Sequence, residues 1–304
     1  MNNLRDNLIK TIRFFAPAEG LNATPIHGVY CLKFSHPERF SKRRWRSCLA
    51  LLAQGSKEIV LERDVYHCDE KHFTAALVDL PVVSRITSAS PQNPFLAMLI
   101  DLDPMIVSET AAQLSEDNNG DAEKSLRAIF IGETNEEMLA GAVRLGKLFR
   151  ISQDARVVGP LVVREMIYHL LKGSHGNAIR RFVRSGSKTH IISRCIYGLQ
   201  AELNRDVDVP ALAKAAHMSR SAFFEHFKEV TAMSPIQYQK RLRLLEARRL
   251  MVDAGETAEA SAFKVGYRSA SQFSREYSRM FGNAPLRDAL KMRTNGGAQL
   301  LGAR

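Results

Sequence analysis

The stretch ASQFSREYSRMFGNAP, residues 270–285, repeats a pattern that the chain already carries fifty residues upstream, in SAFFEHFKEVTAMSP at 221–235. Further upstream, Ala213 falls opposite Ala262 and His217 opposite Gly266 with a shift of 49, so the turn of the second copy is longer by one residue. This agreement in residue type and spacing indicates an internal duplication. With a shift of fifty, the coincident pairs are Ser219 and Ser269, Ser221 and Ser271, Phe223 and Phe273, Phe227 and Tyr277, Ala232 and Gly282, and Pro235 and Pro285.

Each copy predicts a helix-turn-helix unit. A short helix containing a small residue leads through a tight turn into a serine-capped helix with aromatic residues four apart, and the next helix begins at a proline. A long helix from Pro235 to about Val252, closed by Gly255, would join the two units, and Gly282 would end the capped helix of the second. The predicted N-caps are Asp208 (before Pro210), Ser219, Ser234, Thr257 and Ser269.

The outer face of each capped helix supplies candidate DNA contacts, because the aromatic pairs turn the other face toward the core. Arginine can pair bidentately with guanine, serine can reach base edges or phosphate, and a carboxylate such as Glu225 can accept a hydrogen bond from cytosine. The alternative is an ordinary basic surface helix. The candidates are Arg220, Ser221, Phe224, Glu225 and Lys228 in the first copy and Arg268, Ala270, Ser271, Ser274 and Arg275 in the second.

The segment QKRLRLLEARRL, residues 239–250, lies within the predicted connecting helix. A helix of roughly 18 residues spans about 27 Å, close to the separation of about 34 Å between successive major-groove faces of B-DNA. We therefore expect it to hold both units against one side of a duplex, with Leu242, Leu245 and Leu250 available for packing. Its basic residues are expected to be mostly solvated, with some reaching phosphates: Lys240, Arg241, Arg243, Arg248 and Arg249.

Composition agrees with a polyanionic partner. The 304 residues are 45% apolar, enough for a core in each of two domains, and the net charge is +11. From His190 onward there are 18 Lys and Arg against 11 Asp and Glu, so most of the excess lies in the last third. This skew favours a polyanionic partner for that third, the alternative being a solvated basic helical surface. Together with the duplicated helix-turn-helix units it predicts double-stranded DNA as the partner.

The chain before this third predicts a β-rich domain with trailing helices. Six short segments rich in β-branched or aromatic residues suggest a sandwich or small barrel, and the polar segment 115–125 is expected to be a loop. Helices are predicted at 136–149 and 157–173, and a glycine-rich basic junction at about 175–190 divides the chain into domains 1–185 and 190–294. The predicted strands are 28–34, 46–53, 57–62, 72–80, 81–89 and 94–102.

One face of the predicted helix at 157–173 carries an apolar stripe of Leu161, Ile167, Leu170 and Leu171. Such a stripe at helical spacing is typical of a core face, and the alternative is a face that forms a homodimer. Both possibilities stay open at this point.

The remaining composition excludes several other classes of protein. Charges interrupt the first fifteen residues, and no uncharged run reaches the roughly 18 residues that span a bilayer, so we expect a cytoplasmic protein without membrane contact. Cys31, Cys48, Cys68 and Cys195 are scattered, which argues against a zinc finger or a disulfide framework. Cys48 or Cys68 would be reactive only with a lowered pKa.

The segments TAMSPIQYQKRLRLLEARRLM (231–251) and FKVGYRSASQFSREYSRMFGNAP (263–285), in this order, resemble the AraC/XylS family of bacterial transcription regulators over about residues 195–290. QGSKEIVL, VDLP, DLDP and PLVVREMIYHLLKG extend the resemblance into the regulatory domain of one subgroup. The resemblance implies a multidomain α+β fold: an N-terminal cupin-like β-barrel with trailing helices, then an all-α domain with two helix-turn-helix units. It also implies an activator that contacts RNA polymerase, responds to a small molecule and can form a homodimer.

Three positions depart from the family pattern. His217 stands where the turn glycine is usual, which would place a non-glycine residue in a left-handed conformation. Ser261 replaces an aliphatic residue, and Glu225 replaces a common arginine, so guanine recognition by the first copy is in doubt. Arg275 matches the common arginine of the second copy.

The resemblance predicts an effector site in the barrel mouth, where Trp45, Gln54, Lys57 and Phe73 could line a pocket; the alternative is that they are core and turn residues. No cofactor or catalytic residue is predicted, because the only dense group of ligand types, residues 66–72, does not fit a cupin metal site. The basic run at 41–47 is expected to be a solvated edge. The rival functions are a constitutive DNA-binding protein without effector and a metal-dependent cupin enzyme with a DNA-binding tail.

Overall fold

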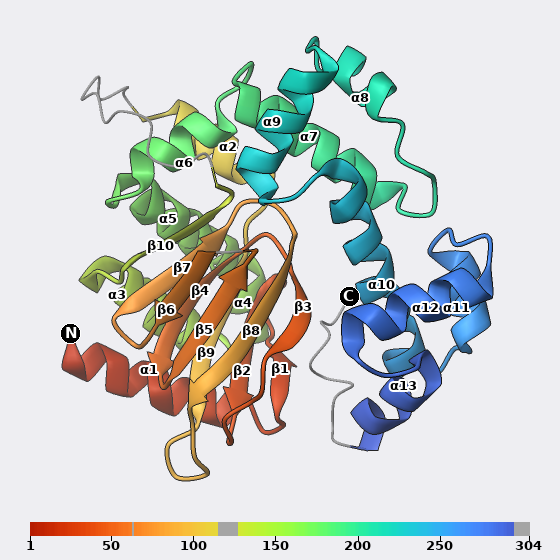
Figure 1. The fold of residues 1–304 in the computed structure, drawn as a ribbon. Helices are drawn as coiled ribbons and strands as arrows, with labels where there is room; N and C mark the ends of the chain where they lie inside the picture. The colour runs from red at the N-terminus through yellow and green to blue at the C-terminus, as the bar shows by residue number, and fades with distance from the viewer. Residues whose placement is uncertain (63, 115–126, 295–304) are drawn as a thin grey trace.

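The computed structural model describes residues 1–62, 64–114 and 127–294. Antiparallel sheets and helices occupy the first part of the chain, and helices alone follow β10 (Figure 1). The predicted loop at 115–125 lies outside the described residues. No helix in the described ranges is long and apolar enough to cross a membrane.

The β-rich part consists of two sheets. One has the strand order β1-β2-β9-β4-β7-β10 and the other β3-β8-β5-β6, with every neighbouring pair antiparallel. All six predicted strands are confirmed, and four more were not predicted: β1, β3, β6 and β10. No described strand pair joins the sheets into a closed barrel. The strands are β1 Gly20–Ala23, β2 Val29–Phe34, β3 Ser41–Trp45, β4 Cys48–Gln54, β5 Ser56–Leu61, β6 Asp64–Cys68, β7 His72–Ala76, β8 Leu80–Ser88, β9 Phe95–Asp101 and β10 Ile129–Glu133.

Helices cover the larger sheet, and the apolar stripe of α5 faces this core. Ile167, Leu170 and Leu171 are buried there, whereas Leu161 is 64% exposed, so its predicted place in the stripe is wrong. Nine residues, or about two and a half turns of an α-helix, separate Leu161 from Leu170, so the two side chains lie on opposite faces of α5, and Val162 is buried in the first turn instead. The predicted junction at about 175–190 itself contains a helix, α6. The helices up to this point are α1 Asn2–Phe15, α2 Pro104–Ala112, α3 Glu136–Leu148, α4 Ser152–Val157, α5 Gly159–Lys172 and α6 Gly176–Val183.

The last third forms the two predicted helix-turn-helix units, α8–α9 and α11–α12, joined by α10. All five predicted caps are present, because each side-chain oxygen accepts a hydrogen bond from a backbone N–H in the first turn. Ser234 and Gln237 also form a reciprocal capping box. The helices are α7 Lys188–Ala201, α8 Val209–Ala215, α9 Arg220–Thr231, α10 Pro235–Asp253, α11 Ala258–Lys264, α12 Ala270–Phe281 and α13 Pro285–Thr294.

The two units differ in how their cores are connected. Phe223 and Phe227 of α9, with ring centroids 5.8 Å apart, belong to one continuous apolar cluster that runs from the sheets through α7 to Leu242 of α10. Phe273 and Tyr277 of α12 belong to a second cluster that begins at Leu244. The first unit therefore shares its core with the β-rich part, and the second has its own.

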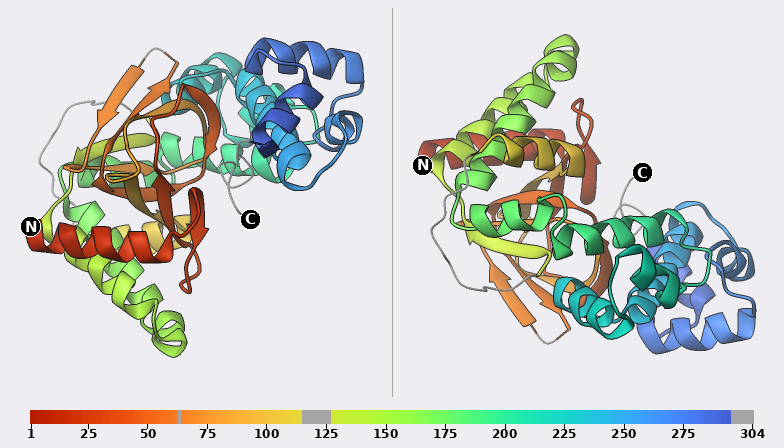
Figure 2. Two further views of the ribbon diagram at one scale, coloured as in Figure 1. Left: turned by 90° about the horizontal axis from the view of Figure 1, so that it is seen from below. Right: turned by 90° about the horizontal axis from the view of Figure 1, so that it is seen from above.

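The arrangement in space follows this division. Figure 2 shows α10–α13 projecting from the side of the molecule away from the N-terminus. The proposed domain limits of 1–185 and 190–294 remain a prediction, since the packing changes within α10.

The left-handed turn predicted at His217 is present, with φ 53°. This conformation costs a non-glycine residue about 1 kcal/mol or more, and His217 is exposed, so its side chain gives little packing in return. We expect His217→Gly to raise the free energy of unfolding in urea by about 0.5 to 1 kcal/mol. His36→Gly, at an exposed site without positive φ, should lower it instead; equal effects at both sites would contradict the argument.

Candidate nucleic-acid interface

The outer face of α9 carries the candidates predicted for the first unit. Arg220, Ser221, Glu225 and Lys228 are exposed, and Phe224 is only partly exposed because it packs against the apolar cluster. Within the described part of the chain, Arg220 has no ion pair. The first turn of this helix therefore presents an available cation beside a small hydroxyl group.

The corresponding face of α12 carries those of the second unit. Ser271 and Arg275 are exposed, and Ala270 and Ser274 are partly exposed. Arg275 has no ion pair among the described residues. Arg268, in the turn before α12, is 90% exposed and its Nη2 lies 3.1 Å from Oδ2 of Asp206.

The two helices are not parallel. In Figure 1, α9 runs steeply, whereas α12 runs across the view, and they lie toward opposite ends of α10. Two helices inserted in the same manner into adjacent major grooves of a straight duplex would have similar directions. Equivalent insertion of both helices therefore requires a change in their relative orientation or a bend in the DNA.

The basic residues of α10 do not form the solvated surface that we expected. Each has a carboxylate partner: Lys240 with Glu276 at 2.7 Å, Arg241 with Glu62 at 2.6 Å, Arg243 with Asp206 at 3.1 Å, Arg248 with Asp288 at 2.8 Å, and Arg249 with Glu246 at 2.7 Å. Arg243 and Arg248 are buried. The prediction failed because four of the five partners come from outside α10, and only Arg249 pairs within the helix, with Glu246.

The loop between α7 and α8 ties the two units together. The Gln239 side chain of α10 donates to the backbone oxygen of Arg205 at 2.6 Å, and Arg243 Nε donates to that of Leu203 at 2.7 Å. A Cβ on Gly266, which has φ +94°, would lie 2.2 Å from the backbone oxygen of Asn204. The turn of the second unit is therefore in direct contact with this loop.

The departure at Ser261 has a visible consequence. The residue is fully buried in the second unit, and its hydroxyl has no hydrogen-bond partner among the described residues. An unpaired buried hydroxyl is unfavourable, so this position contributes less stability than the aliphatic residue of the family pattern would.

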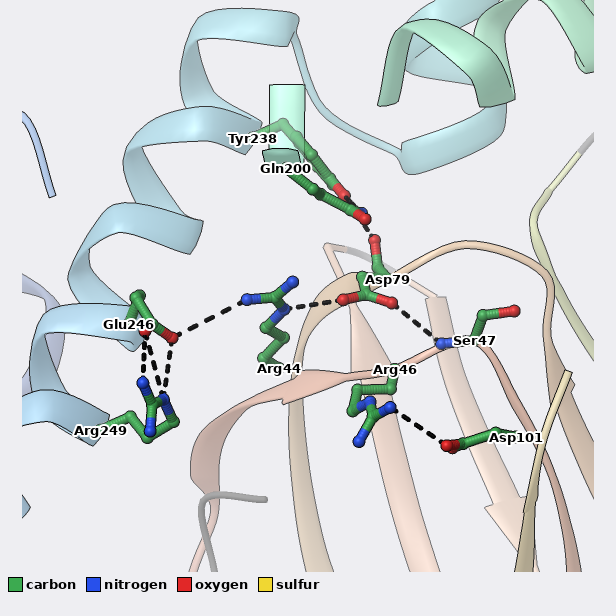
Figure 3. Close-up of polar contacts among 9 residues, drawn as sticks. All are labelled: Arg44, Arg46, Ser47, Asp79, Asp101, Gln200, Tyr238, Glu246 and Arg249. Carbon is green, nitrogen blue, oxygen red and sulfur yellow. Dashed lines mark hydrogen bonds and ion pairs between the residues drawn. The ribbon is translucent and has the colours of Figure 1, made fainter. Parts of the chain in front are cut away.

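A polar network joins the β-rich part to α10 (Figure 3). Arg44 of β3 lies 2.7 Å from Asp79 and 3.8 Å from Glu246 of α10. Tyr238 of α10 donates its hydroxyl hydrogen to the backbone oxygen of Asp79 at 2.6 Å and accepts from Gln200 at 2.8 Å. We call these five residues the seam network.

The basic run at 41–47 therefore is not a solvated edge. It forms β3, in which every residue is partly buried, and β3 faces α10. Lys42 Nζ donates to the backbone oxygen of Met280 in α12. Burial lowers the pKa of Lys42, and the nearby Arg241 and Arg248 lower it further.

The first helix-turn-helix unit, α8–α9, is attached to the β-rich part at the end of α9. Ala128 N–H donates to the backbone oxygen of Val230 at 3.1 Å. Arg127 Nη1 donates to those of Lys228 at 3.1 Å and Glu229 at 3.3 Å, and its Nη2 lies 3.2 Å from Asp64 of β6. No sequence signal pointed to these contacts, because they join residues about a hundred positions apart.

The predicted effector residues are buried or partly buried in the β-rich part. Lys57 is buried and its Nζ lies 4.4 Å from the ring centroid of Trp45, while Phe73 is 3% exposed in the core. Gln54 donates to the backbone oxygen of Pro94 at 2.7 Å. Burial lowers the pKa of Lys57. Their role in binding an effector remains a prediction.

Reactive cysteine and metal chemistry receive no support from the described residues. Burial raises the pKa of Cys48 to about 12 and raises that of Cys68 as well, so both thiols stay protonated near neutral pH. No group of three His, Cys, Asp or Glu within the described ranges converges on a point where an ion could bind.

Comparison with known proteins identifies the family. Residues 25–178, half of the chain, match the model of the AraC-type transcriptional regulator N-terminus, and residues 212–288 match a helix-turn-helix domain. The chain belongs to the AraC family of transcriptional regulators. It thus combines an N-terminal regulatory domain with a helix-turn-helix DNA-binding domain. Since the matched proteins are regulators, the cupin-enzyme alternative is not supported.

Two relatives with assigned roles match shorter stretches of the chain. The transcriptional activator RhaS of Pectobacterium carotovorum subsp. carotovorum is 29% identical over 101 residues, covering 33% of this chain and 36% of RhaS. The RCS-specific activator RclR of Escherichia coli is 35% identical over 77 residues, covering 25% of this chain and 27% of RclR. The regulator therefore matches about a third of the length of these relatives.

The fold of nearly the whole chain has a solved counterpart. ToxT of Vibrio cholerae, in a crystal structure with bound unsaturated fatty acid, aligns over 86% of this chain and 94% of its own, with a TM-score of 0.57 and 13% identity. At that identity the likeness shows the shared two-domain fold alone.

Proposed function

We propose that this regulator is a cytoplasmic activator that binds a specific DNA sequence by placing α9 and α12 in adjacent major grooves. The observation that carries this proposal is the pair of duplicated, serine-capped helices whose outer faces present an arginine without an ion pair among the described residues, Arg220 and Arg275, beside small side chains. RhaS and RclR, which are similar to part of this chain, are transcriptional activators. Contact with RNA polymerase and homodimer formation belong to the same proposal.

Selection of binding sequences by the full-length protein, followed by hydroxyl-radical footprinting, tests this function. We expect one preferred sequence with two protected stretches about 10.5 base pairs apart on the same face of the duplex. Binding without sequence preference, or a single protected stretch, would show that α9 and α12 do not act together.

We further propose that a small-molecule signal controls the angle between α9 and α12 through the seam network. Support comes from the packing: the first unit shares the regulatory core, whereas the second is held by α10, Lys42 and the ion pair between Arg241 and Glu62. A regulatory domain bound in this way favours the non-parallel arrangement. Removing contacts of the seam network should then lower the free-energy cost of changing to the arrangement that binds DNA.

Arg44→Ala is accordingly expected to raise affinity for the selected DNA by about 3- to 10-fold, equivalent to about 0.7 to 1.4 kcal/mol. The substitution removes contacts with both Asp79 and Glu246. Fluorescence anisotropy with a labelled duplex measures the change. Arg46→Ala is the matched control, since Arg46 pairs with Asp101 inside the regulatory domain at 3.1 Å (Figure 3). Equal or lower affinity of the Arg44 variant relative to this control would refute the seam proposal.

A further inference from the structure

A cavity of about 360 Å³ lies between α2 of the regulatory domain and the helices α6 and α7, which lead to the first helix-turn-helix unit. We call it the α7 cavity. Leu77, Leu102, Val107 and Phe182 form an apolar wall, and all four are buried. Its size and lining are those of a small-molecule site. It lies outside the sheets and contains none of the residues predicted from sequence to bind an effector.

Arg194 brings a positive charge to the lining of this cavity. His190 and Arg194 line it from adjacent turns of α7, and neither side chain has an ion pair among the described residues. The one carboxylate in the lining, Glu109, is already paired with Arg164 at 3.4 Å. An apolar wall below an available guanidinium suits a molecule with an apolar body and a single anionic group.

A cavity at the seam also carries cations, but most of them are already bound. Its Lys240 and Arg241 bind Glu276 and Glu62, and its Lys42 binds the backbone oxygen of Met280. An anion there can meet Arg279, which has no ion pair among the described residues, but it would compete with the carboxylates of Glu62 and Glu276 in the same lining for the other cations. The cavity beside α7 offers Arg194 without that competition.

The wall of the α7 cavity is bonded directly to the DNA-binding part. Leu77 accepts a hydrogen bond from the Tyr197 hydroxyl of α7 at 2.8 Å and donates its N–H to the backbone oxygen of Ala128 at 2.9 Å. Ala128 in turn donates to Val230 at the end of α9. A molecule that displaces Leu77 or Tyr197 would therefore act on α7 and α9 through one or two hydrogen bonds.

A second connection leads to α10. Ser47, also in the cavity wall, donates its N–H to the Asp79 carboxylate at 3.0 Å, and Asp79 accepts from Tyr238 of α10. The cavity thus meets the seam network at Asp79. Residues 77–79 are therefore connected both to α9, through Ala128, and to α10, which joins the two helix-turn-helix units, through Tyr238.

We propose that the α7 cavity is a regulatory site for a small carboxylic acid with an aromatic or short aliphatic body. The body contacts the apolar wall and the carboxylate binds Arg194. Occupancy shifts α7 and residues 77–79 and so changes the affinity for DNA. The regulatory half of this proposal rests on the proposed function, whereas the binding half does not.

Isothermal titration calorimetry on the full-length protein tests the binding half, with 4-phenylbutanoate as the probe and its uncharged alcohol, 4-phenylbutan-1-ol, as the comparison. We expect the acid to bind at least about tenfold more tightly, equivalent to 1.4 kcal/mol. Arg194→Ala should remove that preference and Arg194→Lys should restore part of it. Lys188→Ala, at an exposed position on the same helix outside the cavity, should change nothing.

Several outcomes would overturn the binding half: no heat of binding for either compound, equal affinity for both, or an unchanged preference in Arg194→Ala. Val107→Phe, which fills the cavity, should abolish binding. Because that variant can fail to fold, the Arg194 variants decide the test. Arg194 is exposed, so we expect these variants to fold, and an unchanged thermal unfolding curve would confirm that they do.

The regulatory half is tested by anisotropy with the selected duplex in the presence of the acid. A several-fold change in DNA affinity that Arg194→Ala abolishes supports it, and acid binding with unchanged DNA affinity refutes it. If the protein binds no DNA at all, the proposed function fails, while the calorimetric result still decides whether the cavity takes the acid.

Discussion

Replacement of Arg275 with alanine is expected to weaken binding to the preferred DNA sequence by about 5- to 150-fold, or 1 to 3 kcal/mol. Arg275 is exposed in the first half of α12 and has no ion pair among the described residues, so its guanidinium can form a bidentate contact with guanine without first breaking a bond to protein. Anisotropy with the selected duplex and with a scrambled duplex of equal length measures the loss.

The scrambled duplex separates base recognition from phosphate contact. If Arg275 binds a base, affinity for scrambled DNA should change little, whereas an equal loss on both duplexes would assign it to phosphate only. Arg275→Lys should recover little, because lysine cannot reproduce bidentate geometry. Arg39→Ala removes one charge from an exposed loop of the regulatory domain and controls for the change in net charge.

The largest expected loss of stability is that of Asp288→Ala, at about 3 to 5 kcal/mol. Asp288 of α13 is 4% exposed and accepts hydrogen bonds from Arg248 at 2.8 and 3.2 Å and from the Tyr277 hydroxyl at 2.8 Å. Its removal leaves the buried guanidinium of Arg248 without a counter-charge. Urea unfolding, followed by circular dichroism, measures the free-energy change.

Replacing the whole polar group distinguishes this cause from a simple loss of packing. The triple variant Arg248→Met, Tyr277→Phe, Asp288→Leu should be less destabilised than Asp288→Ala alone, because it leaves no uncompensated charge. Arg205→Ala breaks the exposed pair with Glu202 and should cost no more than about 1 kcal/mol. A triple variant less stable than the single one would contradict the argument.

Local rules were enough to predict the architecture of the last third. Caps, prolines, glycines and paired aromatic residues act within a few positions of one another, so the helices of both units follow from the sequence. The cupin-like fold of the regulatory domain, like the position of His217 at a turn where glycine is usual, was instead predicted from the resemblance to the AraC/XylS family. The exposed faces of α9 and α12 also follow, because burying Phe223 and Phe273 fixes the opposite side.

Contacts between distant segments could not be predicted in this way. The pairing of Arg241 with Glu62 joins two elements that only the folded chain brings together, so its charge looked available for phosphate. The pairing of Arg44 with Asp79 was missed for the same reason, because its position in a basic run suggested a solvated edge. The α7 cavity was missed because its lining comes from five separate stretches of the chain. Such features depend on tertiary packing rather than on local pattern.

The first apolar cluster ends at Leu242 and the second begins at Leu244. This boundary shows where a chimera between this protein and a relative should be joined. A chimera joined at the glycine-rich junction near residue 185 would separate α7–α9 from the regulatory side chains that cover them, and both parents would have to supply a matching surface. A junction inside α10, between Leu242 and Leu244, would exchange the second half of α10 together with α11–α13, which share one apolar cluster. Operator preference at one half-site could therefore be exchanged between regulators while the sensing half and its attached recognition helix are inherited together.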